Sequence, residues 1–338
     1  MKRILFYSSV NSLELFKTQK FYQIDISILK DLGYDVLLSN RIFDSLLFWK
    51  YDILFSYFYR YSFFAALLAK CFGKKTYFTG GIDSLDSDYA SAFNYKIQAL
   101  FFKLCYWVAD SCIIVSQLDL KNIFKVSSLK KKLSYSEHVI NTKLFIADVP
   151  KEKIFTSIVW MGDEGNVVRK GVDKALQIFA ELKKIPEFVD YRFVIIGRKG
   201  EGEVLVRSII DKYNLKGSVE LKGEVSEEDK INLLKQSKYY FQLSLYEGFG
   251  LAALEALCAN NIIIHSGKGG LANPIYKEQL LFDIDNDFDS ELLKLVNKLA
   301  CFTPITSYDN LLEYYDIQRR KDDFEAIIVN GKSNYKLK

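Results

Sequence analysis

Two glutamates stand eight positions apart in the stretch SLYEGFGLAALEAL, Glu247 before a glycine-flanked phenylalanine and Glu255 after it. The apolar spacing of LAALEALC predicts a helix, and EGFG predicts the turn that precedes it. The N-terminus of such a helix presents free N–H groups and a positive dipole, which together favour phosphate. Ionised carboxylates only accept hydrogen bonds, so a pair of them suits sugar hydroxyls. The stretch therefore predicts a site for a ligand with phosphates between two sugars, the layout of a nucleotide sugar.

Each glutamate, taken singly, also has a purely structural interpretation. Glu247 fits an acidic neighbour of a helix N-cap, and Glu255 fits a solvated helix position. The apolar neighbours of Glu255, which are Leu254, Ala256 and Leu257, weaken the solvated interpretation.

The elements that must position this stretch alternate along the whole chain. Short apolar runs that predict strands, among them RILFYSS, GYDVLLS, RFVIIG and NIIIHS, are separated by amphipathic runs that predict helices. This order predicts an α/β protein with two doubly wound parallel sheets, which we expect to face each other across a cleft. Ligands of such sheets bind beyond the C-terminal ends of the strands, which is where EGFG lies.

Length and a break in pattern divide the chain into domains. A chain of 338 residues is longer than one hydrophobic core usually organises, and the polar segment IADVPKEK separates the two series of strands. We expect an N-terminal acceptor-binding domain over residues 1–148 and a C-terminal nucleotide-sugar domain over 149–307. Residues 308–338 are expected to form a helical segment that crosses back to the N-terminal domain.

Composition excludes several classes of protein. The five cysteines lie in apolar runs without CxxC spacing, which indicates buried thiols in a reducing cytoplasm and no zinc site. The N-terminus reads as a strand more readily than as a signal peptide, and charged residues interrupt the most apolar region, so we expect no transmembrane helix. Residues 1–148 hold 19 Lys and Arg against 13 Asp and Glu, a balance of +6 that fits an anionic surface or acceptor without indicating nucleic acid.

Other motifs narrow the ligand further. Several predicted strands of the second half end in glycine, including Gly162, Gly197 and Gly223, which favours close backbone approach to a ligand as well as simple turns. The usual glycine patterns of nicotinamide-binding and P-loop proteins are absent. The DIDND run, residues 283–287, contains the DxD pattern of metal-dependent transferases, but an acidic solvated turn is the favoured interpretation.

The stretch SLYEGFGLAALEAL also resembles a known family. Glu247, seven residues and Glu255 are similar to the E-x7-E signature of the GT4 family of retaining glycosyltransferases, which have the two-domain GT-B fold with Rossmann-like sheets. The resemblance extends through GVDKAL, FVIIG, VELKGEVSEEDKINLLKQS and NIIIHSGKGG, covering most of residues 157–275, and more faintly through VADSCIIVS. It implies a reaction that needs no metal and no cofactor.

The resemblance implies a role for each matched residue. Glu247 would hold a hydroxyl of the donor sugar, Glu255 would hold the ribose, and Lys170 in RKGVD would bind phosphate. The loop around Gly248, with the amides of Phe249, Gly250 and Leu251, would receive the diphosphate, and Ser244 would shape that loop. Gly197 is expected beside the donor. Charge on the leaving diphosphate would then be stabilised by cations and helix-terminus amides.

Two positions depart from the family pattern. Asp163 stands where a phosphate-binding arginine is expected, so Arg169 is the favoured replacement and Arg198 the weaker one. Gly80 stands where a histidine often precedes a glycine, whereas Asp83 matches an aspartate seen in some members. The catalytic candidates are therefore Glu247, Lys170, Arg169 and Asp83. The two histidines, His138 and His265, are expected to be structural.

These observations lead to one expected activity and two alternatives. The expected activity is the retaining transfer of a hexose from a nucleoside-diphosphate sugar, with UDP favoured, to a glycan or lipid-linked acceptor in bacterial surface polysaccharide or glycoconjugate assembly. The first alternative, motivated by the departures at Asp163 and Gly80, is a non-catalytic GT-B partner subunit. A sugar-nucleotide epimerase is the second, although no histidine and carboxylate set for it can be assigned.

The location of the acceptor is a further expectation. AFNYKIQALFFKLCYWV, residues 92–108, places Lys96 and Lys103 on one helical face among aromatic residues, and a basic run that includes Lys130, Lys131 and Lys132 follows. Such a segment either lies in a membrane interface or packs its aromatic residues in a core. We expect a cytoplasmic protein whose residues 92–132 dock peripherally on the anionic inner face of the membrane.

Overall fold

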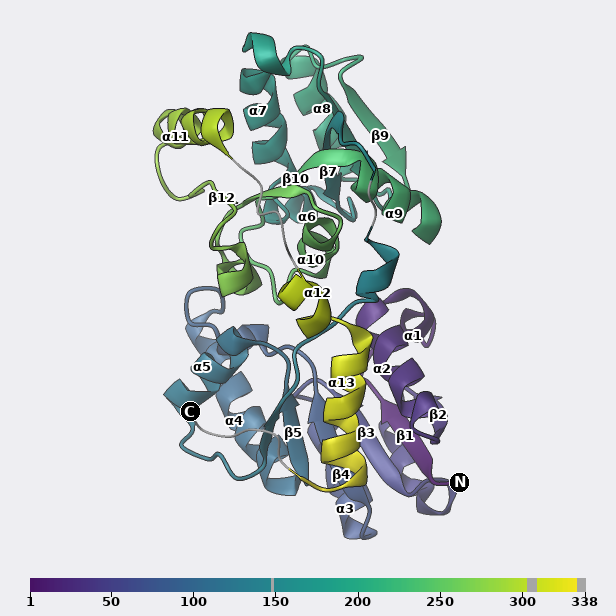
Figure 1. Cartoon of the computed structure of the whole chain (residues 1–338). Helices are drawn as coiled ribbons and strands as arrows, with labels where there is room; N and C mark the ends of the chain where they lie inside the picture. Colours follow the sequence, from purple (N-terminus) through teal and green to yellow (C-terminus); the bar gives the residue numbers. More distant parts are fainter. Residues whose placement is uncertain (147–148, 303–308, 333–338) are drawn as a thin grey trace. The chain divides into compact units, whose positions relative to one another are not determined.

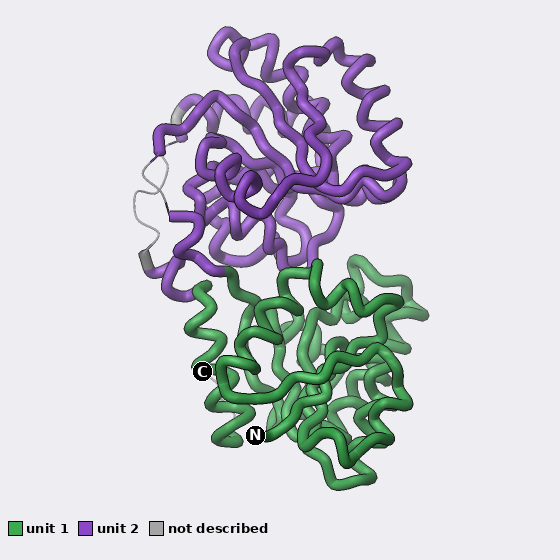
Figure 2. The backbone as a smooth tube through the Cα atoms, turned by 90° about the vertical axis from the view of Figure 1, so that its right-hand side faces the viewer, with its two compact units in different colours: residues 1–140, 315–338 green, residues 141–314 purple. Residues whose placement is uncertain are grey.

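The computed structural model describes residues 1–146, 149–302 and 309–332 and divides into two compact units. Unit 1 comprises residues 1–140 and 315–338, and unit 2 comprises residues 141–314 (Figure 2). The boundaries expected from the sequence, 148/149 and 307/308, involve residues outside the described ranges. The C-terminal residues from Tyr315 onward group with the N-terminal residues.

Unit 1 is built on a parallel six-stranded sheet with the strand order β2-β1-β3-β4-β5-β6 (Figure 1). Its strands are β1 (Arg3–Tyr7), β2 (Asp35–Ser39), β3 (Ile53–Tyr57), β4 (Lys75–Thr79), β5 (Ser111–Ile114) and β6 (Leu133–Tyr135). Its helices are α1 (Leu15–Thr18), α2 (Lys20–Asp31), α3 (Ser62–Cys71), α4 (Ala92–Val108), α5 (Gln117–Val126) and α13 (Ile317–Phe324), with short turns η1 (Ile42–Leu46), η2 (Phe48–Lys50) and η3 (Asp83–Leu85).

Both faces of this sheet are covered, which explains its nearly continuous apolar strands. Successive residues of a strand point to opposite faces, so Leu5 and Tyr7 join the core under α3 and α4, whereas Ile4 and Phe6 join the core under α2 and α13. The sheet therefore has an α3–α4 layer on one face and an α2–α13 layer on the other.

A buried ion pair attaches the C-terminal helix to unit 1. The guanidinium of Arg320 on α13 donates from Nε to Oδ1 of Asp25 over 2.6 Å and from Nη2 to Oδ2 over 2.8 Å. Both side chains are buried, and α13 lies beside α2 in Figure 1. Removing one partner of a buried pair costs roughly 3–5 kcal/mol because the other charge is left uncompensated. The pair thus ties α13 to the first third of the chain.

Unit 2 repeats the architecture with the strand order β12-β11-β10-β7-β8-β9, all pairs parallel. Its strands are β7 (Glu152–Ile158), β8 (Arg192–Ile196), β9 (Val219–Gly223), β10 (Ser237–Gln242), β11 (Ile262–His265) and β12 (Leu280–Leu281). Its helices are α6 (Glu164–Arg169), α7 (Val172–Leu182), α8 (Glu203–Lys212), α9 (Glu227–Gln236), α10 (Leu251–Cys258), α11 (Phe288–Cys301) and α12 (Asp309–Tyr314).

The α/β class and the two parallel sheets expected from the sequence are confirmed. Two local expectations differ from the structure. Strand β10 ends at Gln242 rather than near Leu245. Helix α6, which the apolar pattern does not predict, lies between β7 and α7. Within the described ranges, no helix has the length and apolar character needed to cross a bilayer.

Candidate functional site

The predicted site residues of unit 2 lie on the segments that follow β7, β8 and β10. Helix α10 begins after Gly250, which adopts a left-handed conformation with φ of 86°, and runs from Leu251 to Cys258 as the sequence predicts. The first turns of α7 and α10 present N–H groups that have no carbonyl partner within their own helices. Two helix N-termini of this kind form an environment that favours anions.

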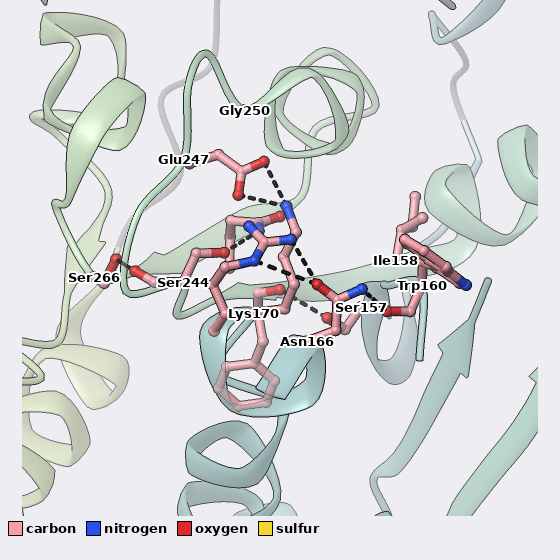
Figure 3. Close-up of polar contacts among 12 residues, drawn as sticks. Ser157, Ile158, Trp160, Asn166, Lys170, Ser244, Glu247, Gly250 and Ser266 are labelled. Atoms are coloured by element: carbon pink, nitrogen blue, oxygen red, sulfur yellow. Dashed lines mark hydrogen bonds and ion pairs between the residues drawn. The ribbon is translucent and has the colours of Figure 1, made fainter. Parts of the chain in front are cut away.

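Lys170 and Glu247 form the central contact of this site. The Lys170 ammonium lies 2.8 Å from Oε1 and 2.7 Å from Oε2 of Glu247, across 77 residues of sequence. Figure 3 shows Lys170 reaching from the junction of α6 and α7 to Glu247 in the loop before α10. Their side chains are 21% and 16% exposed, so each remains accessible to a ligand while held by the other.

A close backbone approach holds Lys170 in place. Gly171, the N-cap of α7, has φ of 67°, and a Cβ at this position would lie 2.0 Å from the carbonyl oxygen of Leu243. The N–H of Leu245 donates to the carbonyl of Arg169 over 2.8 Å. The loop after β10 is therefore attached to the start of α7, and only glycine fits at the contact.

The loop that carries Glu247 is also held from its other side. The N–H of Gly270 donates to the carbonyl of Glu247 over 2.5 Å. The hydroxyl of Ser266 donates to the carbonyl of Ser244 over 2.6 Å, as Figure 3 shows. Ser244 is fully buried and accepts a hydrogen bond from Gln242. The segment after β11 thus supports the loop in which Gly248, Phe249 and Gly250 lie.

Glu255 lies inside the unit rather than in solvent. It is 5% exposed, and its Oε2 lies 2.7 Å from the ammonium of Lys230 on α9, which also contacts Glu227 over 3.1 Å. An ionised carboxylate only accepts hydrogen bonds, so this group suits donors such as ligand hydroxyls. The solvated interpretation of Glu255 is therefore wrong.

Arg169 and Asp163 occupy opposite ends of α6. The Asp163 carboxylate accepts from the N–H of Asn166 over 2.6 Å and thereby caps the helix, which gives this departure from the family pattern a local structural reason. At the other end, Nη2 of Arg169 donates to Oδ1 of Asn166 over 2.9 Å. Arg169 is partly buried beside Lys170, so α6 places a second cation next to the first.

The remaining predicted residues lie at different distances from this contact. Gly197 follows the last residue of β8 with φ of 130° and packs on the carbonyl of Val159, and Arg198 comes next with an exposed side chain. The structure gives Arg198 no contact with Lys170 or Glu247. Asp83 begins η3 in unit 1, whereas all other predicted site residues lie in unit 2.

The surroundings of Asp83 contain an ionisable group that sequence reasoning missed. Asp119 is buried, accepts from the Ser116 hydroxyl and from the N–H of Ile82, and burial raises its pKa to about 7, with Asp83 and Asp86 adding to the rise. The S-x-x-D pattern of Ser116 and Asp119 signals a helix cap, and Ser116 does cap α5. A carboxyl that titrates near neutrality is typical of functional sites and of buried structural ones alike.

Position 80 and the two histidines of the chain decide whether a histidine could act as a catalytic base. Gly80 has φ of 104°, and a Cβ there would lie 3.1 Å from the rings of Phe58 and Tyr57, so a histidine at this position would be strained. His138 and His265 are buried, and burial lowers the pKa of both, that of His265 to about 4. Both imidazoles are therefore neutral at pH 7.

In the described part of the chain, no group of three or more His, Cys, Asp or Glu side chains is placed to hold a metal ion. In the DIDND turn, Asp285 pairs with Lys268, Asp287 caps α11 and Asp283 accepts from the N–H of Asp285. These carboxylates thus serve local structure.

Lys230 and Asn166 are the site residues that the sequence analysis did not find in unit 2. Lys230 meets Glu255 only because α9 and α10 pack together, and 25 residues separate the two along the chain. Asn166 reaches both Asp163 and Arg169 because α6 turns between them. The Lys230–Glu255 contact depends on two helices placed by the fold, whereas the contacts of Asn166 are made within three positions along the chain and depend only on α6 being helical.

The two parallel sheets, each flanked by helices, define the GT-B fold. Solved structures with this fold match nearly the whole chain. The Anabaena protein HepE in complex with UDP matches with a TM-score of 0.71 and 12% identity, covering 98% of this chain and 100% of that one. Sucrose-phosphate synthase from Thermosynechococcus elongatus matches with a TM-score of 0.64 and 16% identity, covering 98% and 97%. At such identities the likeness establishes the fold alone.

Sequence comparison identifies the domain that carries the site. Residues 165–299, which lie in unit 2, match the model of the family Glycosyl transferases group 1. GDP-mannose:cellobiosyl-diphosphopolyprenol alpha-mannosyltransferase of Xanthomonas oryzae is 32% identical over 163 residues, 42% of this chain and 40% of that protein. A human phosphatidylinositol N-acetylglucosaminyltransferase protein is 30% identical over 105 residues, 31% of this chain and 21% of that protein. The chain thus spans less than half the length of these curated relatives.

Proposed function

We propose that the chain is a retaining glycosyltransferase that moves a hexose from a nucleoside-diphosphate sugar, with a UDP-sugar favoured, to a glycan or lipid-linked acceptor. The observation that carries the proposal is the contact of Lys170 with both carboxylate oxygens of Glu247 beside the N-termini of α7 and α10, inside the group 1 domain. A cation, two helix N-termini and an acceptor-only carboxylate suit a sugar diphosphate.

The chemistry follows from these groups. Cleavage of the bond between sugar and diphosphate leaves negative charge on the leaving group, which Lys170, Arg169 and the amides at the start of α10 would stabilise. Glu247 would orient the sugar through its hydroxyls, and Glu255 would hold the ribose. Asp83 in unit 1 is proposed to act on the acceptor side. No metal and no further cofactor is needed, because the cations are supplied by the chain.

The proposed setting is bacterial surface polysaccharide or glycoconjugate assembly on the cytoplasmic side of the membrane. One relative is named for a diphosphopolyprenol acceptor, and another for phosphatidylinositol, which supports a lipid-linked acceptor here. HepE was solved with UDP, whereas the first relative is named for GDP-mannose, so the base must be tested directly.

The purified chain can be assayed with UDP-, GDP- and ADP-sugars. Thermal shifts identify the base, since a ligand at about 100 times its Kd stabilises by about 2.7 kcal/mol. Release of nucleoside diphosphate then demonstrates donor cleavage, and NMR of the anomeric proton of the product shows whether configuration is retained. A stable chain that binds no sugar nucleotide would contradict the proposal.

A non-catalytic partner subunit is the second candidate. It is favoured by the use of Asp163 as a helix cap and by the strain that would accompany a histidine at position 80. Binding of a nucleoside diphosphate without any turnover, with each of the sugar nucleotides tested, would favour this candidate over the transferase.

A further inference from the structure

One layer of unit 1 presents large apolar side chains to solvent. Helix α3 packs between η1 and α4 in the layer over one face of the sheet. Three residues of α4 spaced seven apart, Phe93, Leu100 and Trp107, are 72%, 57% and 68% exposed. A spacing of seven returns to the same side of a helix, so the three form one stripe.

The exposed surface continues from α4 across α3 to η2. Phe64 on α3 is 44% exposed and contacts Phe101 of α4, with ring centroids 6.2 Å apart. Phe72 at the end of α3 stacks on Phe48 of η2 at 4.2 Å, and Phe48 in turn contacts Trp49, which is 59% exposed. We name this surface the aromatic face, and it is defined by Trp49, Phe64, Phe72, Phe93, Leu100 and Trp107.

Such a surface requires an explanation. Scattered exposed apolar residues are normal, but a contiguous group of them marks an interaction site or a membrane surface. The aromatic residues of α4 that the core needs, such as Phe102 and Tyr106, are already buried. The stripe is therefore separate from the core-facing side of the helix.

The charge of the aromatic face distinguishes among partners. Lys96 and Lys103 are exposed and lie between the three apolar residues of the α4 stripe, at positions that share its side of the helix. Neither α3 nor α4 contains an aspartate or a glutamate. A two-fold dimer through this face would bring the lysines of both copies together, because the same patch meets itself. An anionic partner fits the charge.

We propose that the aromatic face is a docking surface for an anionic phospholipid bilayer. Aromatic side chains are favoured at the level of the lipid head groups, and lysines extend their apolar stems along the surface while the ammonium meets the phosphates. Each lysine near an anionic bilayer strengthens binding roughly fivefold. The inference goes beyond the proposed reaction, although it would bring a lipid-linked acceptor to the same unit.

The sequence analysis expects the basic run of Lys130, Lys131 and Lys132 to contribute to docking, but the structure indicates a different set of lysines. The ammonium of Lys132 donates to the carbonyl of Trp107 over 2.8 Å and so serves the end of α4. The ammonium of Lys130 lies 4.9 Å from the ring centroid of Phe124. Two lysines of the run thus have intramolecular roles, and Lys96 and Lys103 are the expected lipid contacts.

The test is co-sedimentation of the full chain with two kinds of vesicle, phosphatidylcholine alone and phosphatidylcholine mixed with phosphatidylglycerol, without any sugar nucleotide. We expect binding only to the mixed vesicles, weakened by salt. Replacing Lys96 and Lys103 with Gln should weaken it roughly thirtyfold. The variant F93S/L100S/W107S should abolish it, whereas V204S/L293S, equally exposed in unit 2 at 70% and 63%, should bind normally.

A second measurement covers the case in which the triple variant does not fold. In a W49F/W160F background the fluorescence of Trp107 should shift to the blue on addition of the mixed vesicles. Absence of binding at low salt, or binding that the aromatic and lysine variants leave unchanged, would overturn the proposal. Light scattering that shows a dimer dissociated by F93S/L100S/W107S would assign the face to a second copy instead. Because no donor is present, failure here leaves the proposed transfer reaction untouched.

Discussion

The ammonium of Lys170 lies within 2.8 Å of both carboxylate oxygens of Glu247, although 77 residues separate the two along the chain. Gly171 lets the loop after β10 approach the start of α7, which brings the two side chains together. The fold thereby places a cation beside a carboxylate in a fixed arrangement, and in the proposed reaction such an arrangement would make electrostatic stabilisation effective.

Loss of the lysine should reduce turnover. Lys170→Ala removes a charge-assisted interaction with the leaving diphosphate, which is worth roughly 1.5–3 kcal/mol or about 10–150-fold in kcat/KM. Lys170→Arg keeps the charge and should recover part of the activity. Steady-state release of nucleoside diphosphate measures both. Lys174→Ala, one turn further along α7, is the matched control, and an equal loss in that variant would refute a specific role for Lys170.

The two glutamates should differ in what they bind. Glu255→Gln is expected to weaken binding of free nucleoside diphosphate by about 10–150-fold, because the ribose loses a charged acceptor, whereas Glu247→Gln should spare it and impair transfer. Titration calorimetry with the nucleoside diphosphate gives the affinities. Glutamine keeps the shape of the buried Glu255, but Lys230 loses this charged partner and keeps only Glu227, so the folded fraction must be verified first. Equal losses of affinity would contradict the assignment.

Arg169 is predicted to replace the arginine that the family has at position 163. Arg169→Ala should lower kcat, and Asn166→Ala should lower it less, since Asn166 acts on the site indirectly, by holding the guanidinium through its Oδ1. The control is Arg198→Ala, because Arg198 is an exposed arginine of the same unit that does not contact the Lys170–Glu247 pair. Unchanged kinetics in Arg169→Ala would strengthen the partner-subunit candidate.

Gly171 should be intolerant of any side chain. In Gly171→Ala the new Cβ meets the carbonyl oxygen of Leu243 at 2.0 Å and also bears the strain of φ at 67°. The strain alone costs roughly 1–2 kcal/mol, and the clash adds to it. Gly217→Ala isolates the strain, because φ there is 83° and no atom lies within 4 Å of its Cβ. Urea unfolding should show a clearly larger loss for Gly171→Ala, and equal losses would show that the close approach is unimportant.

Stability of unit 2 should fall in mild acid. Burial lowers the pKa of His265 from 6.5 to about 4, so between these values the unfolded chain binds a proton that the folded chain does not. The resulting stability is present above about pH 6.5 and is lost as the pH falls toward about 4, on the order of 3 kcal/mol in all. Urea unfolding followed by Trp160 fluorescence in a W49F/W107F background reports on unit 2. His265→Gln should flatten the dependence, and an unchanged slope would exclude His265 as its source.

Local sequence patterns predict the buried strands of this protein and the helix of its candidate site. Apolar runs with β-branched and aromatic residues predict buried parallel strands, because both faces of such strands are covered. The helix of LAALEALC begins at Leu251 and ends at Cys258 as its spacing predicts, and the turn before it carries Glu247. These features are readable because a strand, a turn and a helix start depend on residues within a few positions of each other.

Contacts between distant segments were decided only by the tertiary structure. Asp25 and Arg320 lie 295 residues apart and meet because α2 and α13 cover the same face of the sheet. Lys230 reaches Glu255 because α9 packs against α10. A sequence states which charges are present, but the partner of a buried charge is the one that packing brings within hydrogen-bond distance, and that depends on the whole fold.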